Sequence, residues 1–201
     1  MSVPAASQPA AGPTGEQGRP FPGAEGSTVL ASPPPVPGSG TAPDDGDVTA
    51  RAAELREVVR RVIEDLWGGG DLSLVDELFH PDAVDHMPVP GQPPGLDGLR
   101  EVVTSFHHAF PDLEMTLHQT LADVERSTAV DVWTFTGTHS GELAGLPAPT
   151  GRRVEFGGID VMQVRDGKVA AMWHVEEMAR LLQQLGADGP ESPAGPGSGP
   201  A

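Results

Sequence analysis

Cysteine is absent from this sequence. The chain therefore has no disulfide framework, no thiolate nucleophile and no cysteine-based zinc or iron–sulfur site. Such a chain suits a reducing compartment, so we expect a cytoplasmic protein. Any chemistry must come from histidine, carboxyl and hydroxyl side chains.

Basic residues and long apolar runs are also scarce. The chain has 12 Lys and Arg against 29 Asp and Glu, a formal net charge of −17 at pH 7. This charge would repel a phosphate backbone and an anionic membrane alike, so we expect no nucleic-acid and no membrane partner. Residues 1–17 lack a basic start and an apolar run, and no later stretch approaches the ~18 apolar residues of a membrane span. We predict neither export nor insertion.

Proline and glycine are abundant, with 22 Pro and 26 Gly. They concentrate in residues 1–46 and 188–201, where apolar periodicity is almost missing. Neither end can bury enough surface to offset its ordering entropy, so we predict a disordered leader and a disordered tail. Residues 47–187 are left as one domain of ordinary size.

The domain combines helical and strand patterns. Apolar residues at three- and four-residue spacing predict helices over 48–67, 96–110 and 176–185, with a short helical turn at 74–79. Alternation and β-branched residues predict four antiparallel strands and, at 83–87, a brief further strand. The four strands are 113–118, 129–139, 154–165 and 168–175. We predict an α+β fold: a curved antiparallel sheet forms a cone around the N-terminal helices, and a C-terminal helix closes it.

One carboxylate stands out in this pattern. Asp160 shares a strand face with apolar residues such as Phe156 and Met162. If the hairpin turns at Asp166-Gly167 and pairs Met162 with Met172, His174 lies directly opposite Asp160. The pair could be a general base with its orienting carboxylate. It could equally be a structural polar pair that fixes strand register.

The other histidines are candidate metal ligands, because His80, Asp82, Asp85 and His86 lie close together in HPDAVDH. The sequence has no HExxH motif and no pair of histidines four residues apart on a helix, so we expect no metal. His86 and His139 are pocket candidates because each lies beside a Pro- or Gly-rich loop. They could also be ordinary loop histidines.

Large apolar side chains could line a ligand pocket or fill a core, and only a measured cavity separates the two. We predict a hydrophobic small-molecule substrate. The predicted substrate-binding residues are His86, Phe106, Phe110, Trp133, His139, Phe156, Met162 and Met172.

Residues 58–186 resemble the SnoaL-like polyketide cyclases, also called ester cyclases, of the nuclear-transport-factor-2-like (NTF2-like) superfamily. The resemblance rests on several short segments that occur in order along the domain. These are HPD at 80–82, AFPDL at 109–113, GTHSGELAGLPAPTGRRV at 137–154, DGK at 166–168 and QQLG at 183–186. The superfamily fold alone does not fix a reaction.

The resemblance implies an enzyme of secondary metabolism that carries out an intramolecular aldol condensation of a polyketide ester without cofactor or metal. In such cyclases the base is an Asp on the last strand, just after the position of Trp173, and a His lies on the preceding strand. Here the two are exchanged, because His174 and Asp160 occupy those positions. We assign His174 as the base and Asp160 as its orienting carboxylate.

The resemblance leaves alternatives open. Relatives with this fold include hydroxylases and isomerases of the same pathways, and others are non-catalytic binding or dimerisation domains. It also implies a homodimer or higher homo-oligomer formed through the outer sheet face. The outward positions of Ile159 and Val161 are consistent with such an interface.

Overall fold

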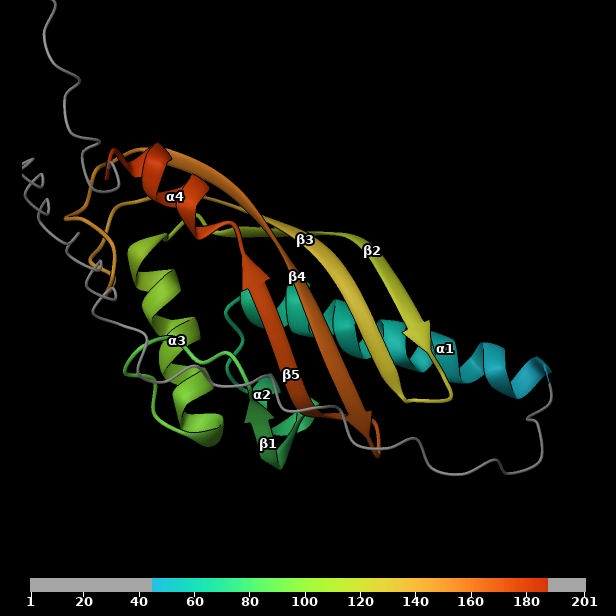
Figure 1. Cartoon of the computed structure of the whole chain (residues 1–201). Coiled ribbons are helices and arrows are strands. Elements are labelled where there is room, and N and C mark those ends of the chain that lie inside the picture. Colours follow the sequence, from blue (N-terminus) through green and yellow to red (C-terminus); the bar gives the residue numbers. More distant parts are fainter. Residues whose placement is uncertain (1–44, 188–201) are drawn as a thin grey trace, which may run out of the picture. The chain divides into compact units, whose positions relative to one another are not determined.

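The structure is a computed structural model that describes residues 45–187 (Figure 1). The predicted leader and tail lie outside this part of the chain, except that Asp45 and Gly46 begin the first helix. Their assignment as disordered segments stays a prediction. Within residues 45–187, no helix has both the length and the apolar character needed to span a membrane.

The predicted first helix is confirmed. Helix α1, Asp45–Arg60, continues directly into the π-helix η1, Arg61–Gly68. One face is buried because its apolar residues recur every three or four positions. These buried residues are Leu55, Val59, Val62, Ile63 and Leu66.

Three further helices follow, close to their predicted places. They are α2 Leu74–Leu78, α3 Gly95–Ala109 and α4 Met178–Leu185. Helix α3 cannot continue through Pro111, and the N–H of Phe110 closes its last turn on the carbonyl of Phe106 at 2.8 Å. Helix α4 ends at Gly186, whose φ of +78° favours glycine.

The sheet has five strands: β1 Phe79–Asp85, β2 Glu114–Asp123, β3 Thr128–Thr138, β4 Arg153–Arg165 and β5 Lys168–Glu176. Their order is β1-β5-β4-β3-β2, and the sheet does not close. Strands β2 to β5 pair antiparallel as predicted, and β4 and β5 form the predicted hairpin. Strand β1 pairs with β5 in parallel, so the sheet is mixed, which corrects the prediction of a purely antiparallel one. The parallel pairing is possible because a helix and three strands separate β1 from β5 along the chain.

The domain is therefore an α+β fold with N-terminal helices, a curved open sheet and a closing C-terminal helix. Figure 1 shows the long strands β3 and β4 bending along their length over α1. Alternate residues of β3 and β4 are buried, and their neighbours on the other face, such as Ile159, are exposed. The sheet thus has one inner face against the helices and one outer face.

Candidate active site

Three ionisable side chains lie side by side across the sheet. The β4–β5 ladder pairs Asp160 with His174 and Met162 with Met172, which confirms the register predicted from the hairpin. The β3–β4 ladder pairs Asp131 with Asp160 in turn. Directly opposite residues on neighbouring strands share a face, with Cβ atoms about 5 Å apart. Asp131, Asp160 and His174 therefore form one row.

This row lies on the inner face. Asp131 is 0% exposed and Asp160 is 5% exposed. In contrast, Ile159, which precedes Asp160 on β4, is 50% exposed, and Val175, which follows His174 on β5, is 66% exposed. The side chain of His174 is 14% exposed. The row therefore runs from a fully buried carboxyl to a partly accessible imidazole.

His174 is held between two carboxylates. Its Nδ1 lies 2.5 Å from Glu176 Oε1, and its Nε2 lies 3.1 Å from Asp85 Oδ1. Burial alone lowers the pKa of His174, but the hydrogen bonds to Asp85 and Glu176 outweigh burial and raise the pKa to about 10. The ring is therefore an imidazolium at neutral pH, and both N–H groups donate to carboxylates.

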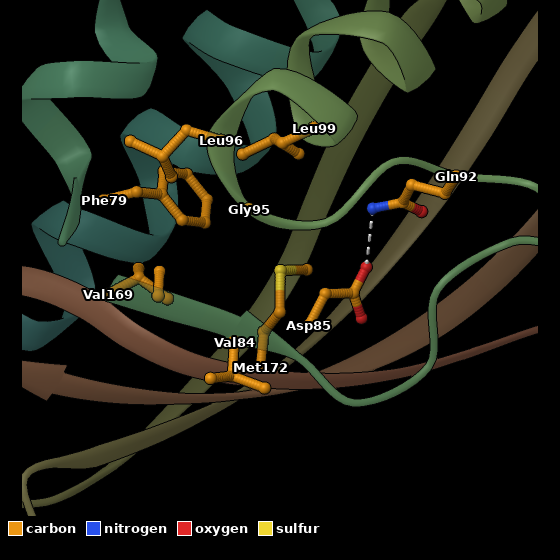
Figure 2. Close-up of a pocket in the computed structure, with 10 residues that line it drawn as sticks. Phe79, Val84, Asp85, Gln92, Gly95, Leu96, Leu99, Val169 and Met172 are labelled. Carbon is orange, nitrogen blue, oxygen red and sulfur yellow. Dashed lines mark hydrogen bonds between the residues drawn. The ribbon is translucent and has the colours of Figure 1, made fainter. Parts of the chain in front are cut away.

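Asp85 reaches His174 because β1 lies beside β5, where Asp85 pairs with Met172. Its Oδ1 accepts from the backbone N–H of Met87 at 2.9 Å, and its Oδ2 accepts from Gln92 Nε2 at 3.2 Å (Figure 2). Burial opposes ionisation, but the hydrogen bonds from His174 and Met87 lower the pKa of Asp85 below its ordinary value. Asp85 is thus a fixed anionic partner of His174.

Asp160 stands apart from this network. Its Oδ1 is buried and has no hydrogen-bond partner among residues 45–187. Burial raises the pKa of Asp160 to about 6, although the nearby N–H of Trp133, which does not meet hydrogen-bond geometry, and the charge of His174 both lower it. A carboxyl group with this pKa can take up and return a proton near neutral pH.

The sequence-based prediction missed Asp131. Neither of its carboxyl oxygens has a hydrogen-bond partner in the described part of the chain. Burial, together with the neighbouring charge of Asp160, raises the pKa of Asp131 to about 8. The alternation that singled out Asp160 also applies to β3, where Asp131 lies between the buried residues Ala129 and Trp133. That signal could have found it.

A small hollow lies beside Asp85. Its volume is ≈ 30 Å³, with Asp85 and Gln92 at its polar side and Phe79, Leu96 and Met172 among its apolar walls (Figure 2). Pockets for drug-sized ligands usually hold about 300 Å³ or more. The hollow therefore touches the hydrogen-bond network of His174 through Asp85, but a large substrate needs it to widen.

Most of the predicted substrate-binding side chains pack against one another. The rings of Phe106 and Phe110 lie 6.3 Å apart, and Phe156 stacks on Phe135 at 4.6 Å. Trp133 lies edge-on to Phe156 at 6.0 Å. Met162 is fully buried, and Met172 lines the hollow. The aromatic residues thus form a core layer, and their contact with a substrate stays a prediction.

The two predicted pocket histidines lie away from His174. His86 stacks on Trp173, with ring centroids 4.2 Å apart. Because Trp173 directly precedes His174 in β5, its side chain lies on the opposite, outer face of the sheet. His139 follows the last residue of β3, is fully buried and stacks on Phe110 at 5.3 Å. A role of either histidine in substrate binding stays a prediction.

The HPDAVDH segment divides its polar residues between two places. His80 and Asp82 both contact Arg165 at the tip of the β4–β5 hairpin, whereas Asp85 binds His174. In residues 45–187, no group of three or more His, Asp or Glu side chains has an arrangement that could hold a metal ion.

A comparison with known families decides the identity. The model of the SnoaL-like polyketide cyclases matches residues 57–185. This chain belongs to the SnoaL-like polyketide cyclase family. The resemblance found in the sequence is thereby confirmed, as is the NTF2-like fold. Among curated proteins, no match to the chain is found.

Solved structures of SnoaL-like proteins resemble this one. TsrD from Streptomyces laurentii is 28% identical, with a TM-score of 0.60, over 67% of this chain and 96% of that chain. IdmH from Streptomyces antibioticus, a proposed polyketide cyclase, is 29% identical, with a TM-score of 0.56, over 66% and 98%. AclR from Streptomyces galilaeus, a proposed hydroxylase, is 28% identical, with a TM-score of 0.58, over 71% and 87%.

The row of ionisable groups is where this SnoaL-like chain departs from the pattern that the resemblance implied. An imidazole, His174, stands on β5, where that pattern has a carboxylate, and Asp160 stands on β4 in place of the histidine. Both types of group are present, on the same face and directly opposite each other. The exchange leaves the pair intact but places the carboxylate one strand further into the sheet.

Proposed function

We propose that this protein is a cytoplasmic polyketide cyclase that performs an intramolecular aldol condensation on a hydrophobic polyketide-type ester, without cofactor or metal. The observation that supports this most is the buried Asp160, which has one unpartnered oxygen and lies opposite the imidazolium of His174. Enolate formation needs a base beside the acidic carbon, and the charge of His174 favours the carboxylate form of Asp160 that can act as this base.

The roles of the two residues follow from their hydrogen bonds. An imidazole with both N–H groups bound to carboxylates has no lone pair with which to accept a proton. In our proposal Asp160 is therefore the base, and the charge of His174 favours the carboxylate form of Asp160. This reverses the roles assigned from the sequence, which could not foresee that Asp85 and Glu176 would both bind His174.

The proposed reaction transfers a proton and forms one carbon–carbon bond. Asp160 takes a proton from a carbon that lies between two carbonyl groups, and the electron pair of that C–H bond forms an enolate. The enolate carbon attacks a ketone carbon elsewhere in the folded chain, which forms a C–C bond and an alkoxide. The proton on Asp160 then passes to the alkoxide, so the base is regenerated.

In the proposal the substrate enters through the hollow beside Asp85 and reaches Asp160 from there. The segment that follows β1 carries Gln92, which is hydrogen-bonded to Asp85 and lines the hollow. This segment, residues 86–94, contains four prolines and has no regular secondary structure. In the proposal it moves outward when a substrate enters, and the hollow then widens.

Asp160→Asn tests the assignment of the base. The probe is ethyl benzoylacetate, whose methylene lies between two carbonyl groups, and the readout is deuterium uptake at that methylene by NMR in D2O. We expect the enzyme-dependent exchange rate to fall by about 10²- to 10⁴-fold, the usual contribution of a general base. Near-wild-type exchange in a folded Asp160→Asn variant would contradict the proposal.

The matched control is Asp123→Asn, which makes the same substitution at an exposed carboxylate that pairs with Arg126 at the end of β2. It should leave the exchange rate unchanged. Circular dichroism and thermal unfolding of both variants separate a lost base from a lost fold.

Hydroxylation is the second candidate, favoured by the similarity to AclR. It keeps the same site but changes the product: with dioxygen as oxidant and a two-electron reductant as co-reactants, one oxygen atom enters a C–H bond, the other becomes water, and no ring is closed. Mass spectrometry of the product distinguishes the two: cyclisation by aldol condensation keeps the mass or loses water, whereas hydroxylation adds one oxygen atom.

A further inference from the structure

Four buried polar atoms without a hydrogen-bond partner gather at one place on the inner face. Among residues 45–187 these atoms are both carboxyl oxygens of Asp131, Oδ1 of Asp160 and Nε1 of Trp133. Buried polar groups are normally hydrogen-bonded, because an unpaired one costs free energy. A cluster of three such side chains on one patch therefore calls for an explanation.

The strand register explains why they meet. Asp131 and Asp160 are directly opposite each other on β3 and β4. Trp133 lies two residues along β3 on the same face, opposite Gly158. The indole lies across Gly158, since a Cβ atom added there would be only 2.2 Å from Cζ2 of Trp133. Because Gly158 has no side chain, the ring of Trp133 can lie on the same part of the inner face as the two carboxyl groups.

In the described part of the chain, the other surroundings of Asp131 are uncharged. Its neighbour on β2 is Thr120, and helix α1, which packs on β2 and β3, buries Leu55 and Val59. Asp160 is the charged group that faces Asp131. Two carboxylates that face each other in an apolar setting cannot both ionise without a large cost.

The remaining charges decide which carboxyl ionises. Asp160 faces His174 on β5, whose positive charge favours the carboxylate form of Asp160. Glu176 on β5 and Asp85 on β1 oppose this, but both are hydrogen-bonded to His174. Asp131 is one strand further from the cation and has no comparable partner. The proton therefore belongs on Asp131.

We propose that Asp131 and Asp160 form a proton-sharing carboxyl pair, in which Asp131 keeps the proton and Asp160 carries the negative charge. Opposite side chains have Cβ atoms about 5 Å apart, so a protonated carboxyl that rotates toward its neighbour can donate to it. The functional part of this inference rests on the proposed role of Asp160 as base. Asp131 is then a positioning residue, which sets the charge of the base without touching the substrate.

The pKa values agree with this geometry. Burial and the charge of Asp160 raise the pKa of Asp131 to about 8, and burial raises that of Asp160 to about 6. Between these values the pair holds one proton. The retention of a fully buried, unpaired carboxyl is otherwise hard to explain, because it costs the fold free energy.

The test is a carboxyl ¹³C NMR titration of the full chain, in the wild type and in Asp160→Asn, Asp131→Asn and the control Asp123→Asn. We expect Asp131 to titrate at a higher pH than Asp160. Asp160→Asn should lower the midpoint of Asp131 by about one pH unit or more, because it removes the facing charge. Asp123→Asn should move neither midpoint. An Asp131 midpoint that stays in place in Asp160→Asn overturns the proposal.

A second measurement separates pairing from packing. Asp131→Asn keeps a neutral donor beside Asp160, whereas Asp131→Leu has a similar size and no donor. We expect the acid limb of the pH profile of deuterium exchange to stay in place in Asp131→Asn and to shift to higher pH in Asp131→Leu. Equal acid limbs in the two variants overturn the proposal. If Asp160→Asn retains full exchange while the NMR titration shows coupling, the proton pair stands and the proposed function fails.

Discussion

Asp131 and His174 both have a strongly raised pKa, and each makes the stability of the domain depend on pH. The pKa of Asp131 rises from 3.8 to about 8 on burial. That of His174 rises from 6.5 to about 10, because its carboxylate partners outweigh burial. In each case the folded state binds the proton more tightly than the unfolded state. Stability is therefore lost as pH rises, from about 4 to 8 through Asp131 and from about 6.5 to 10 through His174.

Asp131→Asn should therefore stabilise the domain. The amide stays neutral at every pH, so the variant avoids the cost of ionising a fully buried carboxyl. We expect a gain on the order of 3–5 kcal/mol at pH 8.5 and a much smaller one near pH 4.5. Urea denaturation at the two pH values measures it. A gain of equal size at both would show that titration of Asp131 is not the cause.

At the scale of elements, the packing of the Trp133 ring of β3 against β4 depends on a glycine, Gly158. A Cβ atom at position 158 would lie 2.2 to 2.6 Å from three ring atoms of Trp133. The indole fits there because Gly158 has no side chain. Strand β4 thus leaves space for a ring carried by β3, and this ring lowers the pKa of Asp160.

Gly158→Ala should displace the indole. We expect a loss of about 1–3 kcal/mol of stability from overpacking, and a rise in the pKa of Asp160 as Trp133 moves away. Near-UV circular dichroism and the carboxyl NMR titration report the two effects. Gly157→Ala is the control, since its added Cβ would approach the carbonyl oxygen of Trp133 at 3.3 Å, a much milder contact than the 2.2 Å at Gly158. If both variants behave alike, Gly158 has no special role.

Local sequence patterns predicted much of this site. The remainder depends on pairing between distant segments, which such patterns do not show. The Asp166-Gly167 turn and the alternation of β4 were enough to place Asp160 opposite His174, because hairpin register is a local property. The parallel pairing of β1 with β5 joins distant segments and left no signal in the sequence, so Asp85 could not be assigned to His174. The protonation state of His174 was missed for the same reason. The small volume of the hollow depends on packing, which periodicity does not encode.

At the scale of the whole molecule, the outer face of the sheet is unusually apolar. Val132, Ile159 and Val175 lie in one row across β3, β4 and β5 and are 37%, 50% and 66% exposed. Leu121 on β2 is also exposed, at 59%. Exposed apolar side chains gathered on one sheet face can mark an interaction surface. This arrangement supports the expectation of a homo-oligomer paired through this face.

The double variant Ile159→Lys/Val175→Lys should dissociate such an oligomer. Two positive charges in the middle of the patch would face their copies across a two-fold interface, where like charges repel. Light scattering after size-exclusion chromatography measures the mass. Gln183→Lys, at an exposed position of α4, is the control and should not change it. A monomeric wild type at micromolar concentration would contradict the expectation.

The parallel partnership of β1 and β5 also has a consequence for biosynthesis. The two residues that join these strands at the site, Asp85 and His174, are 89 positions apart in the chain. A nascent polypeptide that emerges from the ribosome cannot form this ion pair until almost the entire domain has been translated. The proposed activity should therefore arrive late and all at once, and truncations from the C-terminal side that remove β5 should abolish it.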